Sequence, residues 1–587
     1  MNIIGYFHGI DPAACLLVDG RLVAYVEEER LVRVKHADGL FPIRSIEYCL
    51  KAGGLDLEDV DCFAYGWNAP AYSDGTMAAF YEAVNAARPP NDDTLAWQRR
   101  NLSWFHQDSL TERLRRELVR HFGVEKVPPL RFYPHHRSHA VTAYHFSPHD
   151  EALVLTIDGS GDEHTTVVWE GRDGSLEPLW EGTIPHSLGW FYAAITEYLG
   201  FRAYDGEYKV MGLAAYGRPS EAFRDKLAEV VAVGPEGFDF AVDPRFIHHG
   251  GHTYSDRFTD ALVDLLGVPP RLGSAPIEPI HEDLAHEAQA LLEETVLRLV
   301  GHFQQQTGLR RLCISGGVGL NVKMNSRLQR SDLFDEVFAF PIPSDSGCGM
   351  GAAAGIWQDE TGQRVEPLTH LYLGPSFSDA EIEETLALCG VDYRVCDDVA
   401  DETARLLAAG KVVGWFQSGI EGGPRALGAR SILADPRDVA SRDRVNGAIK
   451  FREYWRPFCP SMTEEAAGRY LVGCDRASYM IMAFEATEAA DDEIPAVVHV
   501  DNTVRVQTVD ADSNPRYRAL LEAFETRAGV PVVLNTSFNV KGEAIVNTPR
   551  DALRTFWSTG LDALAIGSCI VEKPAEPRRV EPEDALR

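Results

Sequence analysis

The sequence predicts an α/β protein whose N-terminal part is a duplicated core and whose C-terminal part is a separate α/β domain. A unit of strand, tight acidic or glycine turn and strand occupies about residues 1–30 and occurs again from Glu151. Two copies of one such unit indicate two similar halves with a cleft between them. Near residue 365 a proline-containing connection precedes new strands and helices, so we expect domains at 1–365 and 366–587.

The elements of the two units follow from turn residues and apolar patterns. In the first unit, Asp19-Gly20 lies between apolar stretches, a pair typical of a two-residue hairpin turn. In the second unit, residues 152–157 predict a strand, residues 158–162 a turn, and residues 165–169 a second strand.

A long helix and a glycine loop follow the second unit. Apolar residues at helical spacing over residues 280–306 predict an amphipathic helix, which leads into a strand over residues 311–315. The loop that starts with Ser315-Gly316-Gly317 offers backbone N–H groups to a phosphate at the start of the next helix. It matches neither the G-x-G-x-x-G nor the Walker A pattern, so a plain tight turn is the alternative.

Charge and composition exclude several classes of protein. The 587 residues include 56 Lys and Arg against 88 Asp and Glu, a net charge of −32, which argues against a nucleic-acid partner. No apolar run reaches about 18 residues, so no membrane span is expected. Residues 1–7 lack a basic n-region and predict a strand rather than a signal peptide. Ten cysteines without a C-x-x-C pair are typical of reduced thiols in a cytoplasmic protein.

Two histidines and two aspartates form a candidate metal site. His135 and His139 are four residues apart on a predicted helix and therefore share one face. Asp158 ends a buried strand, and Asp345 precedes a helix of small residues. Such a donor set suits Fe(II), Mn(II) or Zn(II), among which the sequence does not choose. The alternative is that the histidines are solvated or core residues and the aspartates are caps or turn residues.

The segment from Glu27 to His36 packs seven ionisable groups into ten positions. For Glu27, Glu28 and Glu29 a charged surface is a sufficient interpretation. Lys35 and His36 lie beside the first turn and are candidates to face an anionic ligand.

Five arginines and a lysine gather near Gly, Pro and aromatic residues in the second domain. The stretches concerned are residues 422–431, 450–458, 504–507 and 534–539. Guanidinium groups bind phosphate or carboxylate in a bidentate manner, so these stretches predict a pocket for a compact oxyanion. The alternative is that several of the arginines pair with surface carboxylates.

Taken together, these strings resemble the O-carbamoyltransferases of natural-product and nodulation-factor tailoring. The resemblance extends from about Ile3 to Gly567, and its most specific strings are Val26–Arg30 with Lys35-His36, Gly206–Ala214, Gly423–Gly428, Arg456–Phe458 and Leu534–Asn539. It implies an N-terminal domain of the actin/hexokinase-type ATPase class, similar to the threonylcarbamoyl-transfer proteins of tRNA modification. It also implies a YrdC-like C-terminal domain.

The resemblance further implies a reaction in two stages. Carbamoyl phosphate and ATP, the latter with Mg, give carbamoyl-adenylate in the YrdC-like domain. The carbamoyl group then passes to a hydroxyl of a small natural product, an antibiotic or a sugar-containing metabolite, near an Fe(II) ion in the actin-like domain. The implied iron ligands are His135, His139, Asp158 and Asp345. The residues implied to hold carbamoyl phosphate are Arg425, Arg456, Arg505 and Asn535, and those implied to contact the adenylate are Lys35, Ser315, Gly316 and Gly317.

One departure concerns the general base. Members of the family place a His directly before the Asp of the first turn, where Ile10 stands in this chain. His8 and Asp11 are therefore the two candidates for the base, and Lys35 completes the expected catalytic set.

Two other functions and several properties stay open. A threonylcarbamoyl-type tRNA modification enzyme is disfavoured by the negative charge, and a non-catalytic nucleotide-sensing protein is the third alternative. The acceptor is not identified, but residues 67–105 and 233–279 depart most from the family strings and are expected to shape its pocket. Aromatic residues in the first of these segments either cover the acceptor or belong to the core. A homodimer is compatible with the sequence.

Overall fold

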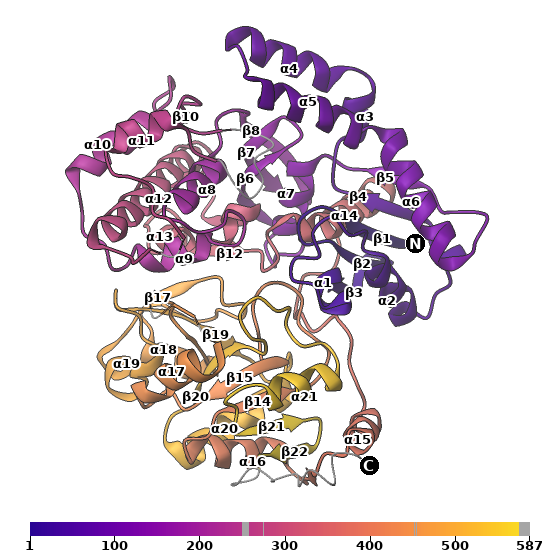
Figure 1. The fold of residues 1–587 in the computed structure, drawn as a ribbon. Helices are drawn as coiled ribbons and strands as arrows, with labels where there is room; N and C mark the ends of the chain where they lie inside the picture. Colours follow the sequence, from indigo (N-terminus) through magenta and orange to yellow (C-terminus); the bar gives the residue numbers. More distant parts are fainter. Residues whose placement is uncertain (249–256, 274, 451, 454, 574–587) are drawn as a thin grey trace, which may run out of the picture.

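The N-terminal part of the protein contains two five-stranded sheets built to the same plan (Figure 1). The computed structural model describes residues 1–248, 257–273, 275–450, 452–453, 455–573. In the first sheet, β1 (Asn2–Phe7), β2 (Ala13–Val18) and β3 (Arg21–Glu27) are antiparallel, and β4 (Cys62–Tyr65) and β5 (Leu130–Phe132) extend it in parallel from β1. In the second, β6 (Glu151–Gly161), β7 (His164–Arg172) and β8 (Ser175–Thr183) are antiparallel, and β11 (Arg311–Ser315) and β12 (Glu336–Ala339) extend it in parallel from β6. The repeated plan confirms the predicted duplicated α/β core.

The two predicted hairpins are present, with one difference. Asp19 and Gly20 both have positive φ, 47° and 80°, as a two-residue type I′ turn requires. The second hairpin turns after Gly161 instead of over residues 158–162, because β6 continues through an irregularity between Ile157 and Gly161. Asp158 therefore lies on an irregular strand segment, and not in the predicted turn.

Two helices pack against each other between the sheets. They are α7 (His135–His145), which lies on β6 and β11, and α14 (Cys348–Thr361), which lies on β1, β2 and β4. A Cβ on Gly351 would stand 2.0 Å from the carbonyl oxygen of Ser138, and a Cβ on Gly5 would stand 1.9 Å from that of Gly349. The small residues of α14 therefore set how closely this helix approaches α7 and β1.

Further helices surround this core. The predicted long helix is α12 (Pro279–Thr307), and it lies against α8 (Leu188–Tyr198), α9 (Glu207–Leu213), α10 (Glu221–Val230) and α13 (Val322–Gln329). Between β4 and β5 the chain forms a helical extension of α3 (Ala69–Ser73), α4 (Thr76–Ala87), α5 (Asp92–Trp104) and α6 (Gln107–Phe122), the upper right part of Figure 1. The remaining elements here are α1 (Glu28–Val32), α2 (Ile43–Gly53), the β9 (Val231–Val233) and β10 (Phe240–Val242) hairpin, and α11 (Asp260–Leu266).

The lower lobe of Figure 1 contains one mixed sheet of eight strands. Its order is β13 (Arg394–Val395), β22 (Cys569–Glu572), β21 (Ala563–Ile566), β14 (Val413–Phe416), β15 (Arg430–Ala434), β20 (Val532–Ser537), β16 (Cys459–Thr463) and β19 (Gln507–Val509). Its helices are α15 (Asp379–Leu388), α16 (Val399–Ala408), α17 (Val439–Val445), α18 (Ala467–Tyr470), α19 (Glu488–Glu493), α20 (Pro515–Ala528) and α21 (Pro549–Trp557), and β17 (Ala483–Glu485) pairs with β18 (Thr503–Arg505). Because α14 ends at Thr361 and α15 packs against α21, we propose residues 1–365 and 366–587 as the two domains.

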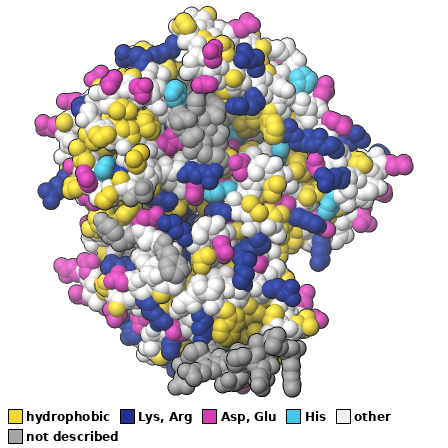
Figure 2. All heavy atoms as spheres, viewed as in Figure 1, with side chains coloured by type: hydrophobic (Ala, Val, Ile, Leu, Met, Phe, Trp, Pro, Cys, Tyr) yellow, Lys and Arg dark blue, Asp and Glu magenta, His cyan; other side chains and the backbone are white. Residues whose placement is uncertain are grey.

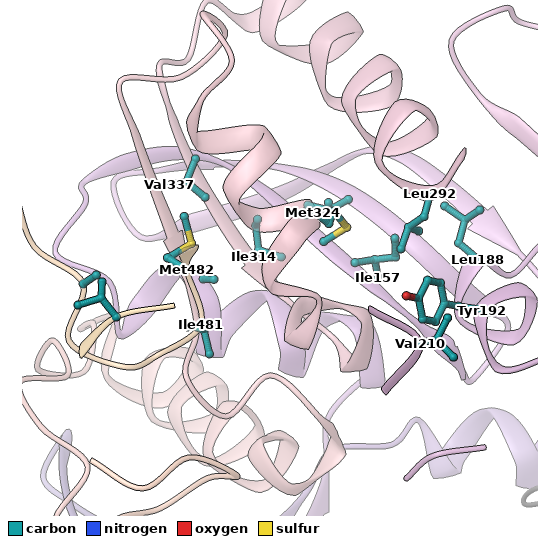
Figure 3. Packing of buried hydrophobic residues seen from close by; sticks show 14 of the residues in the cluster. Ile157, Leu188, Tyr192, Val210, Leu292, Ile314, Met324, Val337, Ile481 and Met482 are labelled. Carbon is teal, nitrogen blue, oxygen red and sulfur yellow. The ribbon is translucent and has the colours of Figure 1, made fainter. Parts of the chain in front are cut away.

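The two lobes share a hydrophobic core. Ile481 and Met482 of the lower lobe belong to the same buried cluster as Ile314 and Val337 of the upper lobe (Figure 3). Burial of these apolar side chains stabilises one arrangement of the lobes.

The surface is mixed in charge. On the face shown in Figure 2, Lys and Arg side chains are interspersed with Asp and Glu side chains. Among the described helices, none is long and apolar enough to cross a membrane.

Candidate active site

The start of α7 carries the two predicted metal-binding histidines. The buried carboxylate of Asp162 accepts the backbone N–H groups of His135, at 2.9 Å, and of Asn68, at 3.0 Å, and so fixes where the helix begins. Since the helix repeats every 3.6 residues, the rings of His135 and His139 meet, with 3.1 Å between their Nε2 atoms. Both rings are fully buried.

The structure brings the two predicted carboxylates to the same two imidazoles. Oδ2 of Asp158 lies 3.1 Å from Nε2 of His139 and 3.7 Å from Nε2 of His135. Oδ1 of Asp345 lies 3.6 Å from both Nε2 atoms. The four side chains come from β6, α7 and the short turn before α14, so both halves of the core contribute.

A fifth donor, Cys348, was not predicted from the sequence. Its buried sulfur lies 3.4 Å from Nε2 of His139, and it groups with His135, His139 and Asp345 within the reach of one cation. Cys348 lies three residues after Asp345, at the start of α14. This spacing would have predicted it, had cysteine been considered as a ligand beside His and Asp.

The donor set fits a divalent cation. Nδ1 of His135 lies 3.1 Å from the carbonyl oxygen of Gly66, and Nδ1 of His139 lies 3.3 Å from Oγ of Ser315. Such partners fix the ring orientation and leave both Nε2 atoms directed at a common point. Burial lowers the pKa of both imidazoles, but Cys348 and the carboxylates outweigh burial and hold each pKa well above its ordinary value. The cluster therefore stabilises positive charge.

The glycine loop lies directly against this cluster. Gly316 has φ of 92°, and a Cβ there would stand 2.2 Å from the carbonyl oxygen of Ile157. A Cβ on Gly317 would stand 3.0 Å from Oδ1 of Asp158. Ser315, Gly316 and Gly317 thus place backbone beside the metal-binding side chains, a position in which only glycine fits at residue 316.

Four guanidinium groups line one pocket at the junction of the lobes. They belong to Arg425, Arg452, Arg456 and Arg505, so the structure brings together the three arginines predicted to hold carbamoyl phosphate and adds Arg452. Burial, followed by repulsion from Arg505, lowers the pKa of Arg425 to about 9. A pocket in which cations repel one another favours an anionic ligand.

Three other predicted residues of this region lie outside the described lining of the pocket. Arg430 is fully buried and donates to backbone carbonyls, among them that of Gln417 at 2.5 Å. Nζ of Lys450 donates to the carbonyl oxygen of Ser537 at 2.7 Å. Asn535 is buried, and its Nδ2 donates to the carbonyl oxygen of Ala426 at 3.2 Å, next to Arg425. Its Oδ1 has no hydrogen-bond partner among the described residues, so a role of Asn535 in binding carbamoyl phosphate stays a prediction.

One continuous segment joins the metal-binding cluster to the arginine pocket. It starts at Ser315 and Gly317 beside the cluster and reaches Val322 and Lys323, which line the pocket. The lining of the pocket also includes Tyr208, Met211 and Gly212 of α9, part of the string Gly206–Ala214. Residues 315–323 therefore contribute to both sites.

The expectation that Glu27, Glu28 and Glu29 form a charged surface is wrong. All three are at least nine-tenths buried: Glu29 binds neighbours in the same segment, whereas Glu27 and Glu28 also have distant partners. Oε2 of Glu28 accepts the N–H of Ser45 at 2.8 Å, at the start of α2, and Oε1 of Glu27 accepts the N–H of Gly423 at 2.6 Å. The second contact anchors the loop that carries Arg425.

The catalytic candidates of the first turn occupy two environments. Nε2 of His8 contacts a guanidinium nitrogen of Arg113, and burial followed by that cation lowers the pKa of His8 to about 3. Asp11 instead lies 2.8 Å from Nδ1 of His36. Nζ of Lys35 is 3.1 Å from Oε2 of Glu29.

The aromatic residues of the helical extension divide between core and surface. Residues 67–105 contain seven aromatic residues, which were expected either to cover the acceptor or to belong to the core. Four of them are buried: Trp67, Tyr72, Tyr81 and Trp97. Trp104 is 41% exposed and carries the guanidinium of Arg113 at 3.6 Å from its ring centre. Of the second variable segment, residues 249–256 and 274 lie outside the described residues.

Comparison with known proteins identifies the family. A model described as carbamoyltransferase N-terminus matches residues 2–354, and one described as carbamoyltransferase C-terminus matches residues 404–573. The chain belongs to the carbamoyltransferase family. This confirms the resemblance noted in the sequence, and a carbamoyltransferase is an enzyme, so a non-catalytic sensing role is set aside.

Similar proteins extend over nearly the whole carbamoyltransferase chain. An uncharacterized protein of Synechocystis is 36% identical over an alignment of 613 positions. The alignment covers 99% of this chain and 97% of that protein. The nodulation protein NolNO of Sinorhizobium fredii is 38% identical, covering 98% of this chain and 80% of that protein. Nodulation protein U of Rhizobium tropici is 29% identical, covering 92% of this chain and 91% of that protein.

Proposed function

We propose that this carbamoyltransferase uses carbamoyl phosphate and ATP to carbamoylate a hydroxyl group of a small natural product. The observation that carries the proposal is the pairing of two sites along one segment, with an arginine pocket at residues 322–323 and a metal-binding cluster beside residues 315–317. A pocket of four guanidiniums suits a substrate with phosphate groups, and a buried cluster of imidazoles, carboxylates and a thiol suits group transfer.

The first stage activates the carbamoyl group in the arginine pocket. Arg425, Arg456 and Arg505 bind the phosphate of carbamoyl phosphate, and Arg452 adds charge for the phosphates of ATP with its Mg. Water cleaves carbamoyl phosphate to carbamate and orthophosphate. An oxygen of the carbamate then forms a bond to the α-phosphorus of ATP, the bond from that phosphorus to the bridging oxygen breaks, and pyrophosphate leaves, which gives carbamoyl-adenylate.

The second stage delivers the carbamoyl group to the acceptor. Backbone N–H groups of Ser315, Gly316 and Gly317 donate to the adenylate, and Lys35 adds a positive charge at the same interface. His135, His139, Asp158 and Asp345 hold an Fe(II) ion, which when bound polarises the carbamoyl carbonyl. An enclosed path between the two sites is part of this proposal, because it would shield the reactive adenylate from bulk water.

The acceptor is a hydroxyl-bearing small molecule, for which the helical extension offers a surface. The exposed ring of Trp104 stacks on the partly buried guanidinium of Arg113, next to His8. Aromatic faces bind sugar rings and other apolar faces of natural products. All ten cysteines are free, which supports a cytoplasmic site of action.

The test is product analysis after incubation with carbamoyl phosphate and ATP. The proposal expects AMP, pyrophosphate and orthophosphate in equal amounts, with pyrophosphate formed only when carbamoyl phosphate is present. Formation of ADP by transfer of the γ-phosphoryl group to an acceptor hydroxyl would contradict it. A gel-shift experiment with tRNA at moderate salt tests the alternative of a tRNA modification enzyme. Because the net charge is −32, we expect no complex between the protein and tRNA.

A further inference from the structure

His36 is held between two carboxylates that come from distant parts of the chain. Its Nδ1 lies 2.8 Å from Oδ1 of Asp11, and its Nε2 lies 3.2 Å from Oδ1 of Asp205. The backbone N–H of His36 donates to Oε2 of Glu29 at 2.7 Å, which fixes the loop that carries the ring. An imidazole with one nitrogen bound by a carboxylate has a fixed orientation and tautomer.

Backbone strain converges on this arrangement. Asp11 has φ of 58°, His36 has φ of 64°, and Tyr204, directly before Asp205, has φ of 63°. Residues other than glycine enter the left-handed region at a cost, and such residues gather at functional sites. Three separate segments therefore each contain a residue in a conformation of higher free energy, and together they bring the imidazole and both carboxylates into contact.

The segment that carries Asp205 approaches both of the sites described above. Asp205 directly precedes Gly206–Gly212, the end of which lines the arginine pocket. On the other side, a Cβ on Gly159, the neighbour of Asp158, would stand 3.8 Å from the hydroxyl of Tyr204. His36 therefore contacts, through Asp205, a segment that approaches both the metal-binding cluster and the arginine pocket.

The other candidates for a base are poorly suited. His8 has a pKa lowered to about 3, and its Nε2 is occupied by Arg113. Asp11 already binds Nδ1 of His36. A general base is effective when its pKa lies near the working pH, which a group with a pKa of about 3 does not meet.

We propose that His36 is the general base of the transfer stage and that Asp11 is its positioning residue. This inference rests on the proposed function. Nε2 of His36 accepts the proton of the acceptor hydroxyl, whose oxygen takes the place of Asp205 as hydrogen-bond partner. The oxygen forms a bond to the carbamoyl carbon, the bond from that carbon to the adenylate oxygen breaks, and AMP leaves.

The charged groups around His36 set the expected pH dependence. Burial lowers the pKa of His36, but the carboxylates of Asp11 and Asp205 outweigh both burial and the ammonium of Lys35 and raise it to about 8. The base must be neutral, so the rate of transfer rises with pH through this value. Asp205→Asn removes one carboxylate and moves the rise to lower pH.

The experiment compares the wild type, His36→Gln, Asp205→Asn and the control His302→Gln, which changes an exposed histidine of α12. Glycerol is the hydroxyl probe, and hydroxylamine is a nucleophile that needs no base. Exchange of pyrophosphate into ATP, dependent on carbamoyl phosphate, reports the first stage.

We expect His36→Gln to lower carbamoylation of glycerol by about 10²–10⁴-fold and to abolish its rise with pH. Exchange and trapping by hydroxylamine stay within about threefold of the wild type, as they do in the control. Glycerol transfer by His36→Gln near the wild-type rate, loss of exchange in that variant, or an unshifted profile in Asp205→Asn would overturn the inference. Absence of exchange in the wild type would instead overturn the proposed function.

Discussion

The sulfur of Cys348 lies 3.4 Å from Nε2 of His139, within the group of donors that surrounds one point between α7 and α14. A thiolate at this position makes the cluster softer than a site of imidazoles and carboxylates alone, and so favours Fe(II), Co(II) or Zn(II) over Mg(II).

Cys348→Ser is therefore expected to weaken Co(II) binding by about 10–100-fold and to remove the near-ultraviolet charge-transfer band of a cobalt–thiolate bond. Titration of the apoprotein with Co(II), followed by absorption, measures both. Cys389→Ser, which changes an exposed thiol, serves as control and should behave as the wild type. An unchanged spectrum in Cys348→Ser would show that this sulfur does not bind the metal.

Arg425→Ala and Arg456→Ala remove two of the four guanidiniums that line the pocket. Because these groups balance the charge of the phosphate, each substitution is expected to lower kcat/KM for carbamoyl phosphate by about 10²–10³-fold. Steady-state formation of AMP measures the effect, and Arg405→Ala, on the exposed side of α16, is the control. If both pocket variants kept the wild-type kcat/KM, the arginines would not bind this substrate.

Gly351→Ala is expected to lower the free energy of unfolding by about 1–3 kcal/mol, because its Cβ would collide with the backbone of Ser138 at 2.0 Å. Gly468→Ala, where a Cβ meets no atom within 4 Å, is the matched control and should be neutral. Urea denaturation followed by circular dichroism compares the two. Equal stability of the two variants would mean that α7 and α14 do not require this close approach.

His145 should make stability depend on pH. Burial, followed by the charge of Arg364, lowers the pKa of His145 to about 3, so the folded protein holds this ring neutral. The unfolded chain takes up a proton near pH 6.5, and the contribution of the ring to stability is therefore lost progressively as pH falls from about 6.5 towards 3.

Between pH 7 and pH 5 the wild type is expected to lose about 2 kcal/mol more unfolding free energy than His145→Gln. Urea denaturation of metal-free protein at the two pH values provides the comparison. Equal losses in the two proteins would show that the folded state binds the proton as readily as the unfolded chain.

The sequence predicted those parts of the site that depend on local periodicity. His135 and His139 are four residues apart and therefore share a helix face. The strand Arg311–Ser315 is followed directly by two glycines, which predict a tight loop. Both features follow from local sequence spacing. The Asp19-Gly20 hairpin has the same local origin.

Features that depend on distant partners escaped prediction. Glu27 reads as a surface charge because its partner, the N–H of Gly423, is almost 400 residues away. In the sequence, Cys348 is one of several small residues of α14. Its role as a metal donor becomes visible only in the fold, where its sulfur lies near Nε2 of His139. Asn535 points at the backbone of Ala426, a contact set by the sheet and not by its neighbours in the sequence.

We propose a division of labour in which the arginine pocket activates the carbamoyl group and the metal-binding cluster transfers it. Its most direct test is the exchange of labelled pyrophosphate into ATP in the presence of carbamoyl phosphate, measured for Arg425→Ala and His139→Ala. We expect His139→Ala to keep exchange within about threefold of the wild type while losing transfer to glycerol, and Arg425→Ala to lose both. Loss of exchange in His139→Ala, or wild-type exchange in Arg425→Ala, would contradict this division between the two sites.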